Sequence, residues 1–273
     1  MAIYEELLCQ FFSQLKREHK RHYEEPYEDR LKKFFKDLAS SYKTIKAATL
    51  SKNNMLALNF NLVELIDPDD RKISDLLALL LNPKETHAQE EKFLEKFLEQ
   101  IKKSLMKTPE LIDGIIYEKL TERTDLMESI IVKKLPIDSE KSIDLAVMLP
   151  NGLVIAIENN LSMEHQKDQL KDYDSFLNET NSRHYLLIYL DAWGRESKSI
   201  DIKRKLKLKA HGKLIEVSYQ RFLKPWLREC FKVCKADKVR WFLRDFIAWI
   251  ERRFPEKPFK DFKTVKQEKT DNF

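Results

Sequence analysis

The chain has 273 residues, of which 42% are hydrophobic and 35% charged, and its 50 basic and 45 acidic side chains leave a net charge of +5. This composition is sufficient for a sizeable buried core, so the chain need not be disordered, while the near balance of charge makes nucleic acid a compatible partner without arguing for it. The four glycines form neither GxGxxG nor GxxxxGKS/T, which excludes the glycine-loop binding of dinucleotides and nucleoside triphosphates.

The sequence also bounds the compartment. No apolar run approaches the roughly 20 residues of a membrane span, and the N-terminus lacks the layout of a signal peptide, so we expect no membrane partner and a cytoplasmic location. Three cysteines without framework spacing agree with a reducing compartment. Cys230 and Cys234 stand on one face of an expected helix, where core packing is the preferred interpretation and a metal site the alternative.

The N-terminal part of the chain has the periodicity of helices. Residues 1–60 carry apolar positions at helical spacing, and Pro26 is expected to separate two helices. A second helical block covers 73–81 and 90–105, with a break at Asn82-Pro83. One apolar stripe, as in a helix that faces a core, runs through the second of these: Phe93, Leu94, Phe97, Leu98, Ile101 and Leu105.

The rest of the chain mixes strands and helices. Residues 115–135 are rich in isoleucine, including Ile115 and Ile116, and are expected to form strands. A helix is expected at 161–178, and helices follow the last strand to about 253. Four short apolar runs complete the strands: 142–149, 153–159, 184–190 and 214–218. This order predicts an α/β fold with a mixed β-sheet flanked by helices.

Composition also suggests how the chain is organised. We expect an N-terminal helical extension over 1–60, a core with C-terminal helices over 61–254, and a polar, lysine-rich tail over 255–273.

A turn between the runs 142–149 and 153–159 decides where two acids lie. Pro150-Asn151-Gly152 fits a three-residue hairpin loop, which pairs Leu149 with Leu153 and places Asp144 opposite Glu158 on one face. A two-residue Asn-Gly loop would put the two carboxylates on opposite faces, because one step of register reverses every side chain. We favour the three-residue loop, since it leaves Pro150 out of the ladder.

Two opposed carboxylates repel each other, and the residues around them are apolar. Exposed strand acids would be the plain interpretation. However, Asn160 joins Asp144 and Glu158 on the same face by the strand period of two, and a bound Mg²⁺ or Mn²⁺ would remove the repulsion and accept oxygen ligands. The hairpin therefore predicts a divalent metal site.

These residues resemble a known pattern. Asp144 followed by Glu158-Asn-Asn160 is similar to the D…(D/E)-x-K motif of the PD-(D/E)XK nuclease superfamily, and the wider sequence resembles its bacterial branch of nuclease-like proteins. The resemblance covers about residues 60–250 and implies a restriction-endonuclease-like fold. It rests on these segments in order: Glu64 with ISDLLALLLNP (73–83), HAQEEKFLEKFL (87–98), SIDLAVMLPNGLVIAIENN (142–160), HQKDQLKDY (165–173) and YLLIYLDAWGRE (185–196).

The resemblance implies a role for each matched position. Asp144 and Glu158 would bind the metal, with the Asn159 carbonyl as a third ligand. Glu64, on a preceding helix, would complete the acidic cluster, although a surface acid is an equal alternative. Gln169 and Tyr173, four residues apart on a helix, would orient the site or the DNA backbone. His87 matches a His-Gly-Gln-Gly element, which reads His-Ala-Gln-Glu in this chain.

Asn160 departs from the motif, which has lysine there. A neutral amide can orient water but cannot supply a cation to the transition state. Three explanations stay open: the enzyme works with asparagine, a lysine such as Lys141 or Lys167 has migrated into the site, or the protein is a catalytically silent relative that still binds metal or nucleic acid.

A basic run lies near the end of the expected core sheet. Residues 203–213 hold six basic side chains, and Lys203, Arg204 and Lys205 are predicted to grip phosphates, with a solvated lysine-rich strand or loop as the alternative. The function expected is that of a metal-dependent nuclease acting on nucleic acid, with DNA the expected form. The alternative is a catalytically inactive module of the same fold that binds nucleic acid or a protein partner. A homo-oligomer is compatible with the sequence.

Overall fold

The structure, a computed structural model, describes Phe12 and residues 26–57, 60–107, 114–161, 168–180 and 184–255. Most of the expected tail, Lys167 and part of the helix expected at 161–178 lie outside these ranges. The chain divides into two compact units, Met1–Phe60 and Asn61–Phe273.

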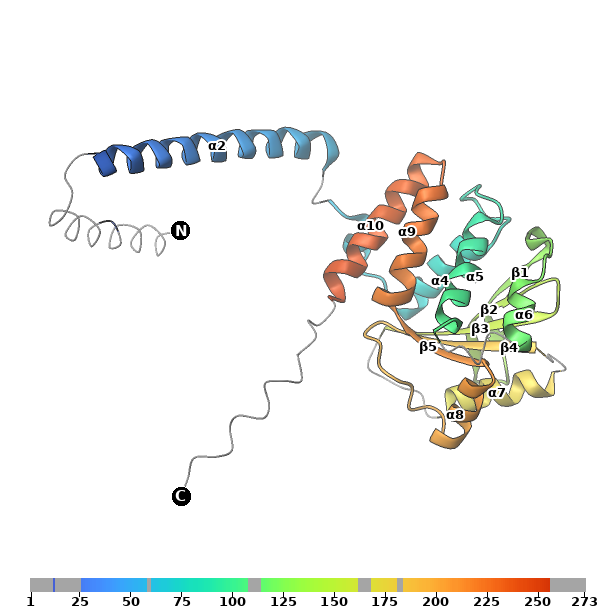
Figure 1. The fold of residues 1–273 in the computed structure, drawn as a ribbon. Helices are drawn as coiled ribbons and strands as arrows, with labels where there is room; N and C mark the ends of the chain where they lie inside the picture. Colours follow the sequence, from blue (N-terminus) through green and yellow to red (C-terminus); the bar gives the residue numbers. More distant parts are fainter. Residues whose placement is uncertain are drawn as a thin grey trace, which may run out of the picture. The chain divides into compact units, whose positions relative to one another are not determined.

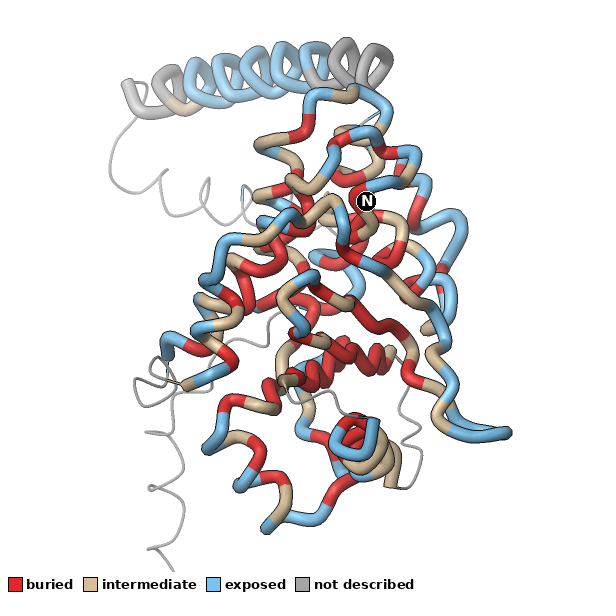
Figure 2. Tube along the Cα trace, turned by 90° about the vertical axis from the view of Figure 1, so that its right-hand side faces the viewer, coloured by how far each residue is buried: buried red, intermediate tan, exposed pale blue. Residues whose placement is uncertain are grey.

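The first unit contains α2 (Pro26–Leu56), a helix of 31 residues. It begins at Pro26, where the sequence predicted a break, because proline is tolerated in the first turn of a helix and disrupts its interior. Its apolar side chains Phe34, Leu38 and Tyr42 are exposed, and most of its described length is exposed in Figure 2. The helical N-terminal region is thereby confirmed.

The second unit is built on a five-stranded sheet with the order β1-β2-β3-β4-β5 (Figure 1). The antiparallel part is β1 (Ile130–Pro136), β2 (Ser142–Met148) and β3 (Leu153–Asn160), and the parallel part continues through β4 (His184–Asp191) and β5 (Leu214–Ser218). Parallel neighbours need a crossover, and a helix lies between the strands of each parallel pair in sequence. The predicted α/β class and the mixed sheet flanked by helices are confirmed.

Helices cover both faces of the sheet (Figure 1). One core lies between the sheet and the helices α4 (Asp70–Leu81), α5 (Lys92–Leu105), α6 (Ile115–Thr121), α9 (Lys224–Val233) and α10 (Asp237–Arg253). A smaller core lies under α7 (Gln169–Glu179) and α8 (Ile202–Ala210). Shorter elements are α3 (Leu62–Ile66), the 3-10 helix η2 (Leu126–Glu128) and the π-helix η3 (Tyr219–Leu223).

The hairpin has the predicted register. Leu145 pairs with Ile157 and Met148 with Val154, and the Leu149 amide donates to the Leu153 carbonyl at 2.9 Å. Gly152 adopts φ +82, the left-handed conformation that the third loop residue requires. The three-residue loop is therefore confirmed, and the two-residue alternative is excluded.

Two predicted elements differ from the structure. Residues 115–121 form helix α6 rather than a strand: Ile116 and Leu120 are both buried, four residues apart on one helical face. The basic run forms helix α8, capped by Asp201, whose side chain accepts from the Arg204 amide at 2.9 Å. In both cases packing of one helical face against the core outweighed a local strand-like pattern.

Other predictions hold. All six residues of the apolar stripe of α5 are buried. Cys230 and Cys234 are buried free thiols, and burial raises the pKa of the Cys230 thiol, as expected for packing residues. None of the helices in the described ranges is both long and apolar enough to cross a membrane.

Candidate functional site

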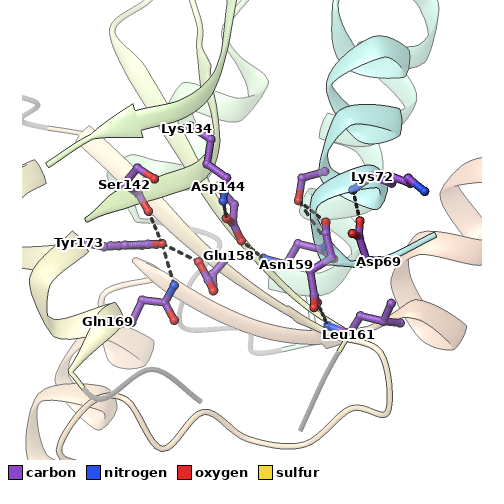
Figure 3. Close-up of polar contacts among 12 residues, drawn as sticks. Asp69, Lys72, Lys134, Ser142, Asp144, Glu158, Asn159, Leu161, Gln169 and Tyr173 are labelled. Atoms are coloured by element: carbon purple, nitrogen blue, oxygen red, sulfur yellow. Dashed lines mark hydrogen bonds and ion pairs between the residues drawn. The ribbon is translucent and has the colours of Figure 1, made fainter. Parts of the chain in front are cut away.

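Two carboxylates meet at the open end of the β2–β3 hairpin (Figure 3). Glu158 is 7% exposed, and the Asp144 side chain is 12% exposed. The hairpin register brings them from neighbouring strands to one place, beside helix α7 (Figure 3). The turn residues predicted that Asp144 and Glu158 would lie together in this way.

The sheet is interrupted at Asp144. The β2–β3 pairs end at Leu145, and the β1–β2 ladder runs up to the pair of Lys133 with Leu145 and resumes only at Ile143. The Asn159 amide donates to Asp144 Oδ2 at 3.2 Å, so a strand amide binds this carboxylate. Ile143 packs in the smaller core and Leu145 in the larger one, so the pleat reverses at Asp144. The carboxylate consequently lies at a break in the ladder.

Burial and charge act together on Glu158. Burial, and next the charge of Asp144, raise the pKa of Glu158 well above its ordinary value, against the opposing effect of the Tyr173 hydrogen bond. Without a metal ion, the pair therefore resists carrying two negative charges, even with Lys134 beside Asp144.

Tyr173 and Gln169 hold Glu158 from α7 (Figure 3). The Tyr173 hydroxyl lies 2.6 Å from Glu158 Oε2 and 2.9 Å from the Ser142 carbonyl, and Gln169 Nε2 donates to it at 3.0 Å. A phenol has one proton, so Tyr173 donates to one of its two acceptors at a time. A protonated Glu158 donates to Tyr173 while Tyr173 donates to Ser142, and an ionised Glu158 accepts from Tyr173. The network fits both charge states of the acid.

Lys134 forms an ion pair with Asp144, one of the two acids. Its Nζ lies 2.6 Å from Asp144 Oδ1, and the lysine side chain is 52% exposed. Lys134 adopts φ +51, which is uncommon for a residue with a side chain. One explanation left open by the sequence was a migrated lysine such as Lys141, but the Nζ of Lys141 pairs with Asp172 at 2.5 Å.

Asn159 turns its side chain to the opposite face of the sheet. Its Nδ2 donates to the Asp70 carbonyl at 2.9 Å and to Ser74 Oγ at 3.2 Å, and its Oδ1 accepts from the Tyr219 hydroxyl at 2.5 Å. These bonds fasten β3 to α4 and η3. Only the backbone of Asn159 faces the two acids, since its amide binds Asp144.

Asn160 is committed to β4. Its Nδ2 donates to the Tyr189 hydroxyl and to Asp191 Oδ2, both at 2.8 Å. Asp191 is fully buried and also accepts from the Arg195 guanidinium, at 2.8 Å for Nη2. Both amide hydrogens of Asn160 are thus used inside the fold, and Asn160 makes its contacts beside the acidic pair rather than with it.

Glu64 is not brought to the hairpin. Its side chain is 53% exposed on α3 and pairs with Arg252 of α10 at 2.8 Å. The acid that a preceding helix does bring to the end of β3 is Asp70, the first residue of α4, whose side chain accepts from the Leu161 amide. The sequence reasoning missed Asp70, although Asp69-Asp70 at a helix start was a visible capping signal.

The basic run is largely used within the fold. Arg204 pairs with Asp174, and Lys205, 7% exposed, pairs with Glu216 at 2.8 Å and with Glu196 at 2.9 Å. Lys203 is exposed. Of the three residues predicted to grip phosphates, Lys203 is exposed, Arg204 is 29% exposed within its ion pair, and Lys205 is buried.

His87 has a structural role. Its Nδ1 accepts from the Gln89 amide at 3.0 Å and its Nε2 lies 2.9 Å from the Asn82 carbonyl, while burial lowers its pKa. Ala88 and Glu90 beside it adopt φ +54 and +56, at the two positions where the similar element has glycine. The turn therefore has a left-handed backbone at both positions without glycine.

The acids fit a divalent cation. Buried Glu158, whose pKa is raised by burial and by the charge of Asp144, and Asp144 beside it provide oxygen donors whose repulsion a divalent charge relieves. Among the described residues, three or more His, Cys, Asp or Glu side chains do not gather in a metal-binding arrangement. Asp144 and Glu158 would therefore hold such an ion with backbone and water oxygens, a mixed shell typical of Mg²⁺.

Comparison with known proteins identifies the family. The family model described as the PD-(D/E)XK nuclease superfamily matches residues 60–251, which include the whole sheet and every residue of the acidic pair's surroundings. No curated protein and no solved structure matches the chain.

Proposed function

The chain belongs to the PD-(D/E)XK nuclease superfamily, and from that premise we propose that it is a metal-dependent nuclease that hydrolyses phosphodiester bonds of nucleic acid, with DNA as its substrate. The single observation that carries the proposal is the contact of Asp144 with buried Glu158 at the break in the sheet. A pair of acids that resists double ionisation lowers the stability of the fold at neutral pH, so a bound divalent cation best explains its place in the fold.

The proposed roles follow the contacts. Asp144 and Glu158 would hold Mg²⁺ or Mn²⁺, with the Asn159 carbonyl as a further ligand, and the ion would supply an activated water and neutralise charge on the phosphate. Tyr173 holds Oε2 of Glu158, and Gln169 fixes the hydroxyl of Tyr173. These two side chains keep the acid oriented while its charge changes.

Two further residues carry weaker roles in the proposal. In the proposal Asp70 replaces Glu64 as the acid that a preceding helix adds to the site, because its side chain accepts from the Leu161 amide at the end of β3. Lys203 remains the proposed phosphate contact of α8. A homo-oligomer stays a prediction, which sedimentation of the full chain would test.

The second candidate is a binding module without catalysis. It is favoured by Asn160, which stands in place of the motif lysine and whose side-chain amide donates to Tyr189 and Asp191. In that case the fold binds nucleic acid, or a protein partner, and leaves it intact.

Cleavage assays separate the two. The full chain is incubated with supercoiled plasmid, linear duplex, single-stranded DNA and RNA, in Mg²⁺, Mn²⁺ or EDTA, beside Asp144→Ala. We expect metal-dependent cleavage of DNA that Asp144→Ala abolishes. Folded protein that cuts none of the four substrates would refute the nuclease proposal and leave the binding module. Cleavage that persists in Asp144→Ala would place the active site elsewhere.

A further inference from the structure

The superfamily motif needs a cation that this chain lacks at position 160. Asn160 is neutral, and its hydrogens are donated to Tyr189 and Asp191. Lys141 is held by Asp172 at 2.5 Å. A positive charge for the phosphate must come from another element if the proposed hydrolysis is to proceed at this site.

Lys134 of β1 is placed to supply it. Among the described residues, it is the lysine or arginine whose ion pair joins one of the two acids, at 2.6 Å from Asp144 Oδ1. The lysine side chain is 52% exposed and Asp144 is 12% exposed, so the ammonium approaches the carboxylate from the solvent side. A substrate would arrive from that same side.

The backbone is distorted to put it there. Lys134 has φ +51, and the β1–β2 ladder omits Lys134 and Asp144 while pairing the residues on either side of them. Lys133, its neighbour, pairs regularly with Leu145. A strained non-glycine residue that faces a candidate site is an observation from which a functional role is reasonably inferred.

We propose that Lys134 is the catalytic cation of this chain, taking from another strand the role of the absent motif lysine. This inference rests on the proposed function. In the metal-free protein Lys134 neutralises Asp144. Once Asp144 is shared with a divalent ion, Lys134 gives up the carboxylate, and its ammonium binds an oxygen of the scissile phosphate, where negative charge develops.

The proposal has two consequences of opposite sign. Removing the ammonium removes a competitor for Asp144, so Mn²⁺ should bind about two- to fivefold more tightly, the usual worth of a half-exposed ion pair. The same change removes a charge-stabilising donor, so cleavage at saturating metal should slow by about 10²- to 10³-fold. A merely structural lysine would weaken both properties together.

The test uses matched variants of the full chain. Lys134→Asn removes the charge and suits a left-handed backbone, and Lys134→Arg keeps the charge. The control is Lys133→Asn on the same strand, where Lys133 pairs with Asp75 at 2.7 Å and is 54% exposed. Mn²⁺ affinity is measured by electron paramagnetic resonance, and cleavage of duplex DNA is measured in single turnovers at saturating Mn²⁺.

We expect Lys134→Asn to bind Mn²⁺ more tightly and cut far more slowly, Lys134→Arg to retain most of the rate, and Lys133→Asn to match the wild type. If the wild type binds Mn²⁺ and cuts DNA, and Lys134→Asn cuts at the same rate or binds Mn²⁺ less tightly, then this inference alone is overturned. Wild-type protein that neither binds Mn²⁺ nor cuts overturns the proposed function, and this inference with it.

Discussion

Replacing Glu158 with glutamine tests the electrostatics of the acidic pair without changing its shape. The raised pKa of Glu158 means that the folded state holds this proton more tightly than the unfolded state. The contribution of Glu158 to stability is therefore full below its ordinary pKa and is lost as the pH rises through the raised value. In EDTA at pH 8, Glu158→Gln should be more stable than the wild type.

The magnitude follows from the contacts. Glutamine can donate to Asp144, and a hydrogen bond to a charged group is worth about 1.5–3 kcal/mol. For a domain of about 200 residues this raises the melting temperature by roughly 3–12 °C. Mn²⁺ at about 100 times its dissociation constant stabilises the wild type by about 2.7 kcal/mol, or roughly 5–11 °C, and should stabilise the variant little.

The assay is thermal unfolding by circular dichroism at pH 8, in EDTA and across a Mn²⁺ titration. Glu118→Gln, at an exposed position of α6, serves as control and should follow the wild type in both conditions. A Glu158→Gln protein that melts below the wild type in EDTA would refute the repulsion. An equal Mn²⁺ shift in the variant and the wild type would show that the ions bind elsewhere.

Three further predictions concern the fold around the site. Glu90→Gly should raise the free energy of unfolding by about 0.5–1 kcal/mol in urea titrations, because Glu90 has φ +56 and glycine adopts that conformation without strain. Lys103→Gly inside α5 should lower the free energy of unfolding by about 1 kcal/mol. A lower free energy of unfolding in Glu90→Gly would contradict this account of the turn. Burial lowers the pKa of His87, so the free energy of unfolding of the wild type should fall as the pH falls from 6.5 to 5, and that of His87→Phe should fall less. Parallel plots of unfolding free energy against pH for the two proteins would exclude this effect. Lys205→Ala should lower the free energy of unfolding by on the order of 3 kcal/mol, because the largely buried side chain of Glu216 loses its ion pair with Lys205. Lys203→Ala should leave the free energy of unfolding unchanged and should reduce the affinity for DNA and its salt dependence. The reverse pattern would show that Lys205, not Lys203, contacts the nucleic acid.

The hairpin and its acids could be predicted because their cause is local. Pro150 and Gly152 select the loop, the loop fixes the register, and the register places Asp144 beside Glu158. Neighbouring residues in the sequence carry all of that information. The resemblance then supplied Tyr173 and Gln169, which the structure places in one chain of hydrogen bonds ending on Glu158.

The contacts that come from other elements could not be predicted in this way. Lys134 reaches Asp144 only because β1 pairs with β2 and the ladder omits that one pair, and Asp70 reaches the end of β3 only because α4 packs there. Neither fact has a signal in the spacing of the residues. The lysines and leucines of 205–209 alternate as in a strand, yet Asp201 caps a helix that contains them, and Lys205 neutralises Glu216 inside the fold.

The most direct measurement is the position of a bound ion. Crystals of the full chain soaked in Mn²⁺ and recorded near the manganese absorption edge would show each Mn²⁺ as an anomalous difference peak. We expect the strongest peak between the carboxylates of Asp144 and Glu158, with Lys134 displaced from Asp144, and no such peak in Asp144→Ala crystals treated in the same way. Two results from wild-type crystals would contradict the metal site on which the proposed nuclease depends. One is Mn²⁺ bound only at other residues; the other is no peak between the two acids at saturating Mn²⁺, with Lys134 still bound to Asp144.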